Sequence, residues 1–417
     1  MIATSCCIVG GGPAGMMLGL LLARAGVDVV VLEKHADFLR DFRGDTIHPS
    51  TLELIHELGV LEQFLKLPHQ EVAALGARFG KKLYRLADFS HLPTQCKFIA
   101  LMPQWDFLDF IAGQGRRYPG FQLKMRAEAT DLILDDGRIA GVRATSPEGP
   151  IEIRAPLVVA CDGRHSILRQ KAGLVADDFG APMDVLWFRL SRKPNDSMAT
   201  GGVFDSGRIF VMLNRGDYWQ CAYVIPKSSL DALRSRGIED FRAEVARTEP
   251  LLSDRVAELT DWQHVHLLTV TVNRLRTWHR PGLLCIGDAA HAMSPVGGVG
   301  INLAVQDAVA AANVLADPLY EKRDVTPLLA KVQDRREFPT RATQRLQLVM
   351  QNTVIKGALK GDADFKPPLV LRLMDRFAGL RRFTARVIGL GVRPEHIRTP
   401  ERSRHPEAPA HSAGLEG

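Results

Sequence analysis

Residues 5–33 read SCCIVGGGPAGMMLGLLLARAGVDVVVLE, and this stretch decides the fold. Residues 5–9 are a short apolar run typical of a buried strand, residues 13–25 are apolar over the length of a helix, and residues 27–32 are a second apolar run. A strand, a helix and a strand in this order predict a β-α-β unit with a parallel sheet.

The turn between the first strand and the helix satisfies the pattern G-x-G-x-x-G, with an acidic residue at the end of the second strand. Such glycines permit a tight turn, let a pyrophosphate approach the backbone and let the helix pack close to the sheet. The free N–H groups of the helix N-terminus attract phosphate. A tight turn without a ligand is the structural alternative. The residues predicted to bind a dinucleotide here are Gly10, Gly12, Pro13, Ala14, Gly15, Glu33 and Lys34.

Two later strand-like runs also end in a glycine-acid pair. Residues 157–161 lead into Asp162-Gly163, and LLCI (283–286) leads into Gly287-Asp288. A further loop with Pro295 and three glycines then runs into an apolar helix that is predicted to start near Asn302. Three such corners at strand ends suggest one ligand that touches all of them. NAD would span two corners, whereas FAD spans the set more naturally.

Taken together, these motifs resemble those of the para-hydroxybenzoate hydroxylase family, the single-component (class A) FAD-dependent aromatic monooxygenases. The resemblance covers roughly residues 5–316, with GxGxxG, DG and GD motifs in the same order. It implies that Glu33 binds the adenosine ribose, Arg43 lies near the pyrophosphate and Gln104 contacts the ribityl chain. The remaining residues that it assigns to FAD are Asp162, Gly163, Arg164, Gly287, Asp288, Gly300, Ile301 and Asn302.

The same resemblance implies the reaction. NADH or NADPH, bound transiently, would reduce FAD, and O2 would then form a flavin C4a-hydroperoxide that hydroxylates a phenolic or quinone-precursor ring. The loop with Pro295, Gly298 and Gly300 would lie along the flavin, where backbone N–H groups stabilise the reduced anion. His291 is a candidate catalytic base, with a structural hydrogen-bonding role as the alternative. No metal site is expected.

The predicted fold class is α/β: a Rossmann-like FAD-binding domain with an inserted antiparallel sheet for the substrate and helices at the C-terminus. We expect FAD binding from residues 1–178 and 276–355, with 71–100 contributing to the substrate side, and the inserted sheet at 179–275. Strand-like alternation means that about half of the candidate substrate contacts face away. These candidates are Trp187, Arg189, Phe210, Met212, Trp219 and Tyr223.

Three rival functions remain open from the sequence. A reductase or dehydrogenase of the same fold would not use O2. A flavin-dependent halogenase typically carries W-x-W-x-I-P, but here Ile225-Pro226 is preceded by Tyr223 and Cys221. A non-catalytic flavoprotein would hold FAD without turnover. Since no second G-x-G-x-x-G follows a strand, we expect no separate NAD(P)H domain.

Composition sets the remaining expectations. The chain has 417 residues, a net charge of +6, and 46% hydrophobic and 24% charged residues, which is globular. Its six cysteines lie mostly in apolar runs and predict a reduced, cytoplasmic protein, and no run is apolar enough to span a membrane. Arginine-rich amphipathic helices at 356–403 would cap the domain or contact an anionic membrane, and the tail 404–417 is expected to be disordered. Nucleic acid is not an expected partner, and the chain is expected to be a monomer or homodimer.

Overall fold

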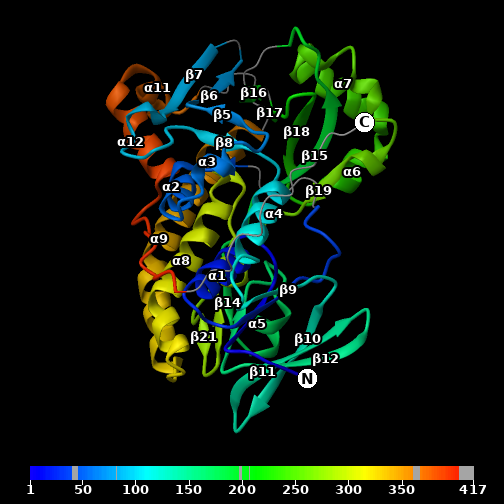
Figure 1. Cartoon of the computed structure of the whole chain (residues 1–417). Helices are drawn as coiled ribbons and strands as arrows, with labels where there is room; N and C mark the ends of the chain where they lie inside the picture. The colour runs from blue at the N-terminus through cyan, green and yellow to red at the C-terminus, as the bar shows by residue number, and fades with distance from the viewer. Residues whose placement is uncertain (40–45, 81, 197–199, 206, 360–366, 403–417) are drawn as a thin grey trace, which may run out of the picture.

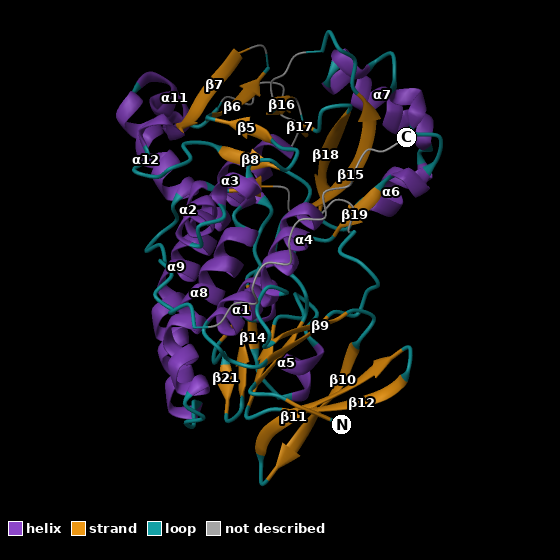
Figure 2. Ribbon diagram, in the orientation of Figure 1, coloured by secondary structure: helices purple, strands orange, loops and turns teal. Residues whose placement is uncertain are grey.

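The computed structural model describes residues 1–39, 46–80, 82–196, 200–205, 207–359 and 367–402. Arg43 and the predicted disordered tail lie outside the described residues. The described chain is a mixed α/β structure (Figures 1 and 2), as the sequence predicts.

A six-stranded sheet forms the base of the fold, in the order β21-β22-β13-β2-β3-β9. All neighbouring pairs are parallel except β21 with β22, so the predicted β-α-β unit is confirmed. The sequence pattern over residues 121–153 predicts a meander, but its first strand, β9, pairs with β3 of this sheet instead. The bounds are β2 (Cys6–Val9), β3 (Val29–Leu32), β9 (Phe121–Lys124), β13 (Leu157–Ala160), β21 (His279–Arg280) and β22 (Leu283–Cys285).

Both faces of this sheet are buried, which explains why its strands are apolar throughout. Cys6 and Ile8 of β2 pack under the helices α1 (Pro13–Arg24), α4 (Gln104–Gly115) and α8 (Gly300–Tyr320). Cys7 and Val9 face the other way, toward a four-stranded sheet and the helix α5 (Ile167–Lys171). That sheet contains β1 (Ile2–Ala3), β10 (Glu128–Asp135), β11 (Arg138–Ser146) and β12 (Gly149–Arg154).

A seven-stranded sheet lies at the other end of the molecule, at the top of Figure 2, in the order β19-β15-β18-β17-β16-β6-β7. Its strands come from two separate parts of the chain, because the hairpin of β6 and β7 joins through a parallel pairing of β6 with β16. The bounds are β6 (Ala74–Phe79), β7 (Lys82–Asp88), β15 (Met183–Ser191), β16 (Gly201–Asp205), β17 (Arg208–Asn214), β18 (Tyr218–Pro226) and β19 (His266–Leu268). The domain boundaries themselves remain a prediction.

Two helices cover one face of the seven-stranded sheet. The sequence predicts one helix over 230–245, but α6 (Leu230–Ser235) and α7 (Ile238–Thr248) are separated at Gly237, whose φ is 89°. Phe241 and Val245 of α7 pack against Phe188 and Phe210 of the sheet. The opposite face packs against Val296, which belongs to the loop before α8. We call this loop, which contains Pro295, Gly298 and Gly300, the flavin loop, because it is predicted to lie along the flavin.

The remaining elements surround this frame. A small sheet joins β4 (Thr46–Ile47), β5 (Gln70–Val72) and β8 (Ile99–Leu101), and a second joins β14 (Ala176–Asp178) and β20 (Asn273–Leu275). The other helices are α2 (Pro49–Glu57), α3 (Leu61–Phe64), α9 (Leu329–Met350), α10 (Lys356–Leu359), α11 (Leu369–Arg376) and α12 (Ala378–Gly389). The turn Gln351–Ile355 between α9 and α10 is a π-helix.

Contrary to the expectation from the sequence, helix α8 and the turn before it are long and apolar enough to cross a membrane, by length and composition alone. However, 83% of its apolar window is buried inside the protein. Its long apolar face packs on α1 within the main core. Its composition therefore reflects a core position.

Candidate cofactor and substrate site

Four neighbouring parallel strands end at the same edge of the six-stranded sheet. Gly10 follows β2, Glu33 follows β3, Cys161 follows β13 and Ile286 follows β22. Ligands of open α/β sheets bind outside the carboxyl ends of the strands. The sequence-predicted corners are thereby brought together at one edge.

Short backbone contacts confirm that the corners converge. A Cβ atom at Gly10, where φ is +109°, would lie 2.3 Å from the carbonyl oxygen of Cys161. A Cβ atom added at Gly287 would lie 3.2 Å from the Cβ atom of Ala14. The N–H of Gly11 donates to Oε2 of Glu33 at 3.0 Å. The first motif therefore contacts the second through its backbone, and it meets the third where Ala14 lies against Gly287.

The glycines of the site divide into two groups. Gly10, Gly15 and Gly298 are packed so tightly that an added Cβ would lie within 2.4 Å of a neighbouring atom. At Gly12, Gly163 and Gly300, an added Cβ would meet nothing within 4 Å. The first group is needed for packing. The second leaves open backbone on the side where a ligand would lie.

Both helices that point at this edge lack side-chain caps. Helix α1 begins after Gly12 with Pro13 at its first position, and α8 begins after Val299. The N–H groups of a first helical turn have no intrahelical partner and carry a partial positive charge. Ala14 and Gly15 of α1, and Gly300 and Ile301 of α8, thus supply donors for phosphate and for an anionic ring edge.

Two side chains in the corners present buried polar atoms that have no protein partner. In Asp162, Oδ2 accepts from the N–H of Leu168 at 3.3 Å, whereas Oδ1 is buried without a hydrogen bond. In Asn302, Oδ1 accepts from Thr51 Oγ1 at 2.6 Å, so Nδ2 is the remaining donor, and it too is buried and unpaired. Buried polar groups are normally hydrogen-bonded. These atoms and the open glycines therefore fit the hydroxyl and carbonyl groups of FAD.

Burial also raises the pKa of Asp162 above its ordinary value, although hydrogen bonds from Ser166 and Leu168 oppose this effect. A ligand hydroxyl that donates to Oδ1 would favour the ionised carboxylate. Asp288 is half-buried in the 3-10 turn Gly287–Ala289 at the end of β22. Gln104 is the first residue of α4, and Pro295 precedes the 3-10 turn Val296–Gly298, and both are half-buried.

Two residues that were predicted to bind FAD, Lys34 and Arg164, lie next to other protein groups in the structure. The side chain of Lys34 is 57% exposed and lies 3.9 Å from Glu128, on the surface strand β10. Arg164 donates from Nη1 to the carbonyl oxygen of Thr269 at 3.0 Å. In this arrangement Lys34 points to the surface, whereas Arg164 connects the DG corner to the segment that leads from the seven-stranded sheet.

His291, the candidate base, belongs to a buried charged cluster behind the loop. Its Nε2 lies 2.6 Å from Asp307 Oδ2, which also accepts from the N–H of Gly287 at 3.1 Å. Arg336 Nε donates to the other oxygen of Asp307 at 2.9 Å. Burial disfavours the charge, but His291 and Arg336 together hold the pKa of Asp307 below its ordinary value. The geometry favours the structural role for His291.

Sequence reasoning missed the side chains that hold the flavin loop from behind. Gln347 of α9 donates to the carbonyl oxygens of Ser294 and Val296 at 2.9 Å each, and its Oε1 accepts from the N–H of Ser294 at 3.2 Å. Gln344 donates to Ala292 O at 3.1 Å, and Gln351 donates to Ser294 Oγ at 2.6 Å. All three glutamines are buried. Their spacing of three and four residues, which places them on one helix face, was the available signal.

Thr46 and His48 were also missed, although both lie beside Arg43 in the sequence. Thr46 Oγ1 donates to the carbonyl oxygen of Gly298 at 2.7 Å, and its methyl and hydroxyl groups occupy the space next to Gly298. Gly298 is therefore needed for packing against Thr46. His48 is fully buried, and its Nδ1 lies 2.9 Å from Ile388 O in α12.

The substrate candidates lie on opposite faces of the seven-stranded sheet. Phe210, Met212, Trp219 and Tyr223 belong to the core under α7, on the face away from the flavin loop. Trp187 lies on the face that carries Val296, and its Nε1 is buried without a hydrogen bond. Arg189 is exposed and stacks on Tyr218 at 4.7 Å. Of the six candidates, only Trp187 shares the apolar cluster of the flavin loop.

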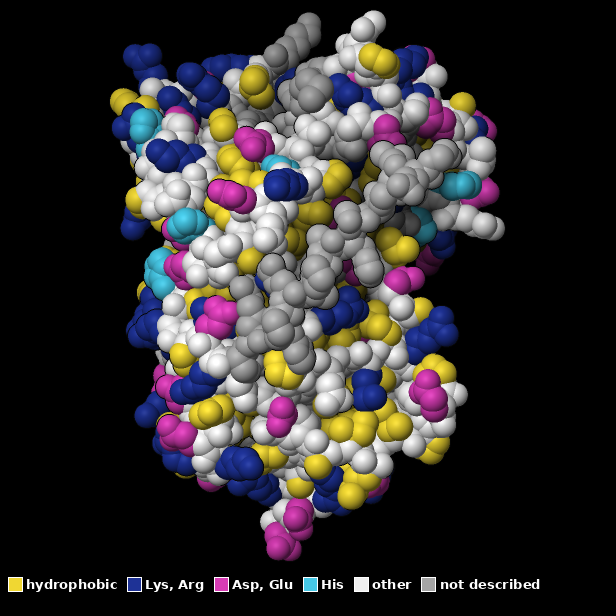
Figure 3. Space-filling view, in the orientation of Figure 1, with side chains coloured by type: hydrophobic (Ala, Val, Ile, Leu, Met, Phe, Trp, Pro, Cys, Tyr) yellow, Lys and Arg dark blue, Asp and Glu magenta, His cyan; other side chains and the backbone are white. Residues whose placement is uncertain are grey.

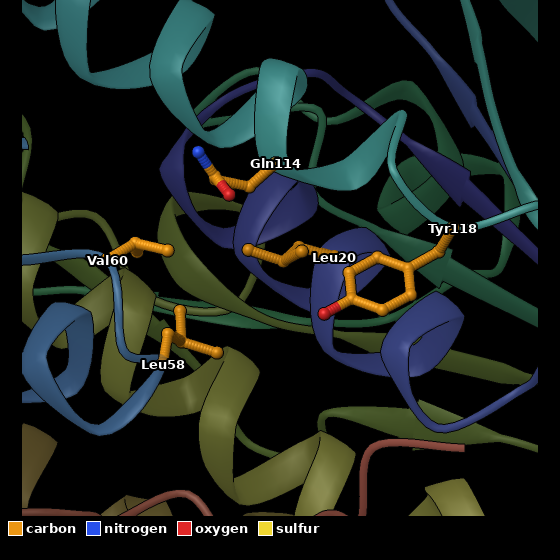
Figure 4. Close-up of a pocket in the computed structure, with 5 residues that line it drawn as sticks. All are labelled: Leu20, Leu58, Val60, Gln114 and Tyr118. Atoms are coloured by element: carbon orange, nitrogen blue, oxygen red, sulfur yellow. The ribbon is translucent and has the colours of Figure 1, made fainter. Parts of the chain in front are cut away.

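One further cavity is too small to hold a cofactor. Figure 4 shows it between α1, α4 and the segment that connects α2 to α3, lined by Leu20, Leu58, Val60, Gln114 and Tyr118. Its volume is about 10 Å³, which is room for a single water molecule. Gln114 and Tyr118 lie at the C-terminal end of α4, at the end opposite Gln104.

Comparison with known proteins places the site in a family. The family model described as "FAD binding domain" matches residues 3–346. The chain is 32% identical over 390 residues to the 6-methylpretetramide 4-monooxygenase of Streptomyces rimosus, covering 92% of each. It belongs to the FAD-dependent aromatic monooxygenases. The resemblance drawn from the three motifs is confirmed.

More distant relatives agree with this assignment, and a solved structure shares the fold. The para-nitrophenol 4-monooxygenase of a Pseudomonas species is 28% identical over 311 residues, 72% of this chain and 75% of that one. A 12-dehydrotetracycline 5-monooxygenase/anhydrotetracycline 6-monooxygenase of Streptomyces rimosus is 29% identical, and the chain spans 60% of its length. A probable FAD-dependent monooxygenase from Pseudomonas aeruginosa has the same fold, with a TM-score of 0.73 and 21% identity over 91% of this chain and 99% of that one.

The two groups of glycines predict different mutational effects. Gly12→Ala should leave the stability of the FAD-free protein nearly unchanged but weaken FAD binding roughly tenfold or more, because its methyl group enters the open space over the α1 N-terminus. Gly15→Ala should destabilise the FAD-free protein itself, because its Cβ would lie 2.0 Å from Gly10 O. Chemical unfolding and FAD titration measure the two effects. Equal loss of stability in both variants would contradict the division.

Loss of the Gln347 side chain should loosen the flavin loop. Gln347→Leu leaves the N–H and C=O of Ser294 and the C=O of Val296 without partners, and should lower the free energy of unfolding by about 3 kcal/mol. FAD should also bind more weakly. The matched control is Gln170→Leu, at an exposed helical glutamine. If both variants bind FAD and unfold like the parent protein, the loop does not depend on Gln347.

His48 should make stability depend on pH. Burial lowers the pKa of His48 from 6.5 to about 4. As the pH falls from 6.5 toward 4, the unfolded chain takes up a proton that the folded chain refuses, so stability falls, by up to about 1.4 kcal/mol per pH unit. His48→Asn retains a donor toward Ile388 without titrating. Its unfolding free energy should fall less steeply over this window, and identical slopes would contradict the assignment.

Proposed function

We propose that the protein uses NADH or NADPH and O2 to hydroxylate a phenolic aromatic compound. Bound FAD would accept a hydride from the nicotinamide and activate O2, and the chain would bind, orient and shield the reactants. The convergence of the three glycine-acid corners at one sheet edge is the observation that carries the proposal. Glu33, Asp162, Asp288 and the first turns of α1 and α8 would hold FAD.

The substrate would lie between the flavin loop and the near face of the seven-stranded sheet. Apolar side chains dominate this face, including Val185, Val211 and Ala222 next to Trp187. Such a surface excludes water and favours a flat apolar ring, while Trp187 Nε1 offers one hydrogen bond to a substrate oxygen. Ile355 and Ala358, which follow α9, belong to the same cluster and would close the site from the side.

The relatives suggest which rings to test first. Two of them are named for pretetramide and anhydrotetracycline oxidation. We therefore propose a fused-ring phenolic substrate, with single-ring phenols as weaker substrates. All six cysteines are free, which supports a reduced, cytoplasmic setting. The proposed state in solution is a monomer or homodimer.

Substrate-dependent turnover tests this function. The purified holoenzyme should oxidise NADH or NADPH faster when a fused-ring phenol is present, consume O2, and release a product heavier by one oxygen atom. Trp187→Phe should raise KM about fivefold with little change in FAD content, because one neutral hydrogen bond is lost. Steady-state kinetics and mass spectrometry of the product give both results.

Trp262→Phe provides the control, because Trp262 stacks on Phe241 on the far side of the sheet. Its KM should match that of the parent enzyme. Reduction of the substrate without O2 uptake would identify a reductase, a halogenated product would identify a halogenase, and a flat response across all rings would indicate a non-catalytic flavoprotein. Each of these results would refute the proposal.

A further inference from the structure

The two C-terminal helices, α11 and α12, pack over the edge strand β7 of the seven-stranded sheet. Leu371 of α11 is buried against Phe79 and Tyr84. Asp375, one turn later, accepts from the N–H and the Nε of Arg85 and lies 3.6 Å from Lys82. Ala385 of α12 is buried beside Phe89. The predicted capping role of this region therefore agrees with its packing.

The opposite side of the same helices remains apolar and open to solvent. Leu369 and Phe383 are each 65% exposed, and Phe377 is 54% exposed. Val370, Leu373 and Leu380 are exposed on the same helices. A solvated helix normally places polar residues on its outer side. Here α11 has apolar residues on the side that packs on the sheet and also on its outer side. This pattern is expected for a helix whose outer side is covered by a partner.

Arginines surround these apolar residues. Arg372, Arg376, Arg382 and Arg386 are exposed, and none of them is held in a salt bridge within the described part of the chain. Figure 3 shows basic and hydrophobic side chains together at the upper left, where α11 and α12 lie in Figure 1. The only acidic residue of α11 and α12, Asp375, faces inward. We call the six apolar residues and these four arginines the C-terminal face.

A hollow of about 240 Å³ adjoins this face, between α12 and the end of β7. Arg382, Phe383 and Arg386 line one wall, and Asp88 and His91 line the other. The carboxylate of Asp88 is already engaged by the hydroxyl and N–H of Ser90, and these bonds help to lower its pKa. The charge of Arg382 also helps to lower the pKa of Asp88, although the two side chains form no salt bridge among the described residues. Both guanidinium groups at the rim can face an anion such as a lipid phosphate.

We propose that the C-terminal face docks the enzyme on an anionic lipid surface. Apolar side chains interleaved with arginines match the boundary between acyl chains and negatively charged headgroups. A second copy of this chain is a poorer partner for the same face, because two such faces would bring eight arginines together without an outward acid on these helices to pair with them.

Vesicle sedimentation of the full-length holoenzyme tests this proposal. The protein should bind vesicles made of equal parts phosphatidylcholine and phosphatidylglycerol, and should stay in solution with phosphatidylcholine alone. Binding should weaken as salt is added. Each neutralised arginine should reduce the partition coefficient about fivefold, so the fourfold variant Arg372→Gln, Arg376→Gln, Arg382→Gln, Arg386→Gln should lose measurable binding. Leu373→Ser with Phe383→Ser should also weaken it.

The control variant carries Arg154→Glu and Leu134→Ser, two exposed changes on the four-stranded sheet at the other end of the molecule, and should bind vesicles like the parent protein. Unchanged FAD absorbance and turnover of dissolved substrate show that every variant is folded. Failure of the parent protein to bind phosphatidylglycerol vesicles would overturn the proposal. So would a dimer, seen by light scattering, that Leu373→Ser with Phe383→Ser converts to monomer, because the face would then belong to a second copy.

Discussion

The site depends on the parallel register of four short strands. Because β22, β13, β2 and β3 run in the same direction side by side, each delivers its following residue to one edge of the sheet. The turns then meet backbone against backbone, which only glycine permits at Gly10 and Gly15. A change of direction in any of these strands would carry one motif to the opposite edge. The rest of the protein holds this edge in place and encloses what binds to it.

A second layer of interactions fixes the loop between β22 and α8. Asp307 ties the start of the loop to α8 through Gly287. Arg336 links Asp307 to Glu395 near the described C-terminal end, with Nη1 of Arg336 3.3 Å from Oε1 of Glu395. A buried charge that loses its partner costs several kcal/mol, so this cluster fixes the arrangement strongly. Gln344, Gln347 and Gln351 then hold the middle of the loop by its backbone. The backbone N–H groups of the loop can therefore face a ligand, because side chains from other segments hold the loop in place.

Much of the fold could be predicted from the sequence, because apolar runs and glycine spacing are local signals. They identified the β-α-β unit and all three corners. Local signals failed where a partner is distant in sequence. Ser50 and Glu53 have the form of a capping box, yet α2 begins at Pro49, with His48 as its cap, and Glu53 instead accepts from the N–H of Gln95 at 3.0 Å. Alternation separated the two faces of the seven-stranded sheet, but could not tell which one faces the flavin loop, since that depends on the packing of α7 and Val296.

The convergence of the three corners fixes how FAD should lie on the protein, and a structure of the FAD complex tests this directly. The pyrophosphate should contact the N–H groups at the start of α1, the ribityl chain should reach Asp288, and the pyrimidine edge of the flavin should face the first turn of α8. An isoalloxazine ring bound away from the segment 297–302, or a nucleotide that touches only the first of the three corners, would contradict the central claim.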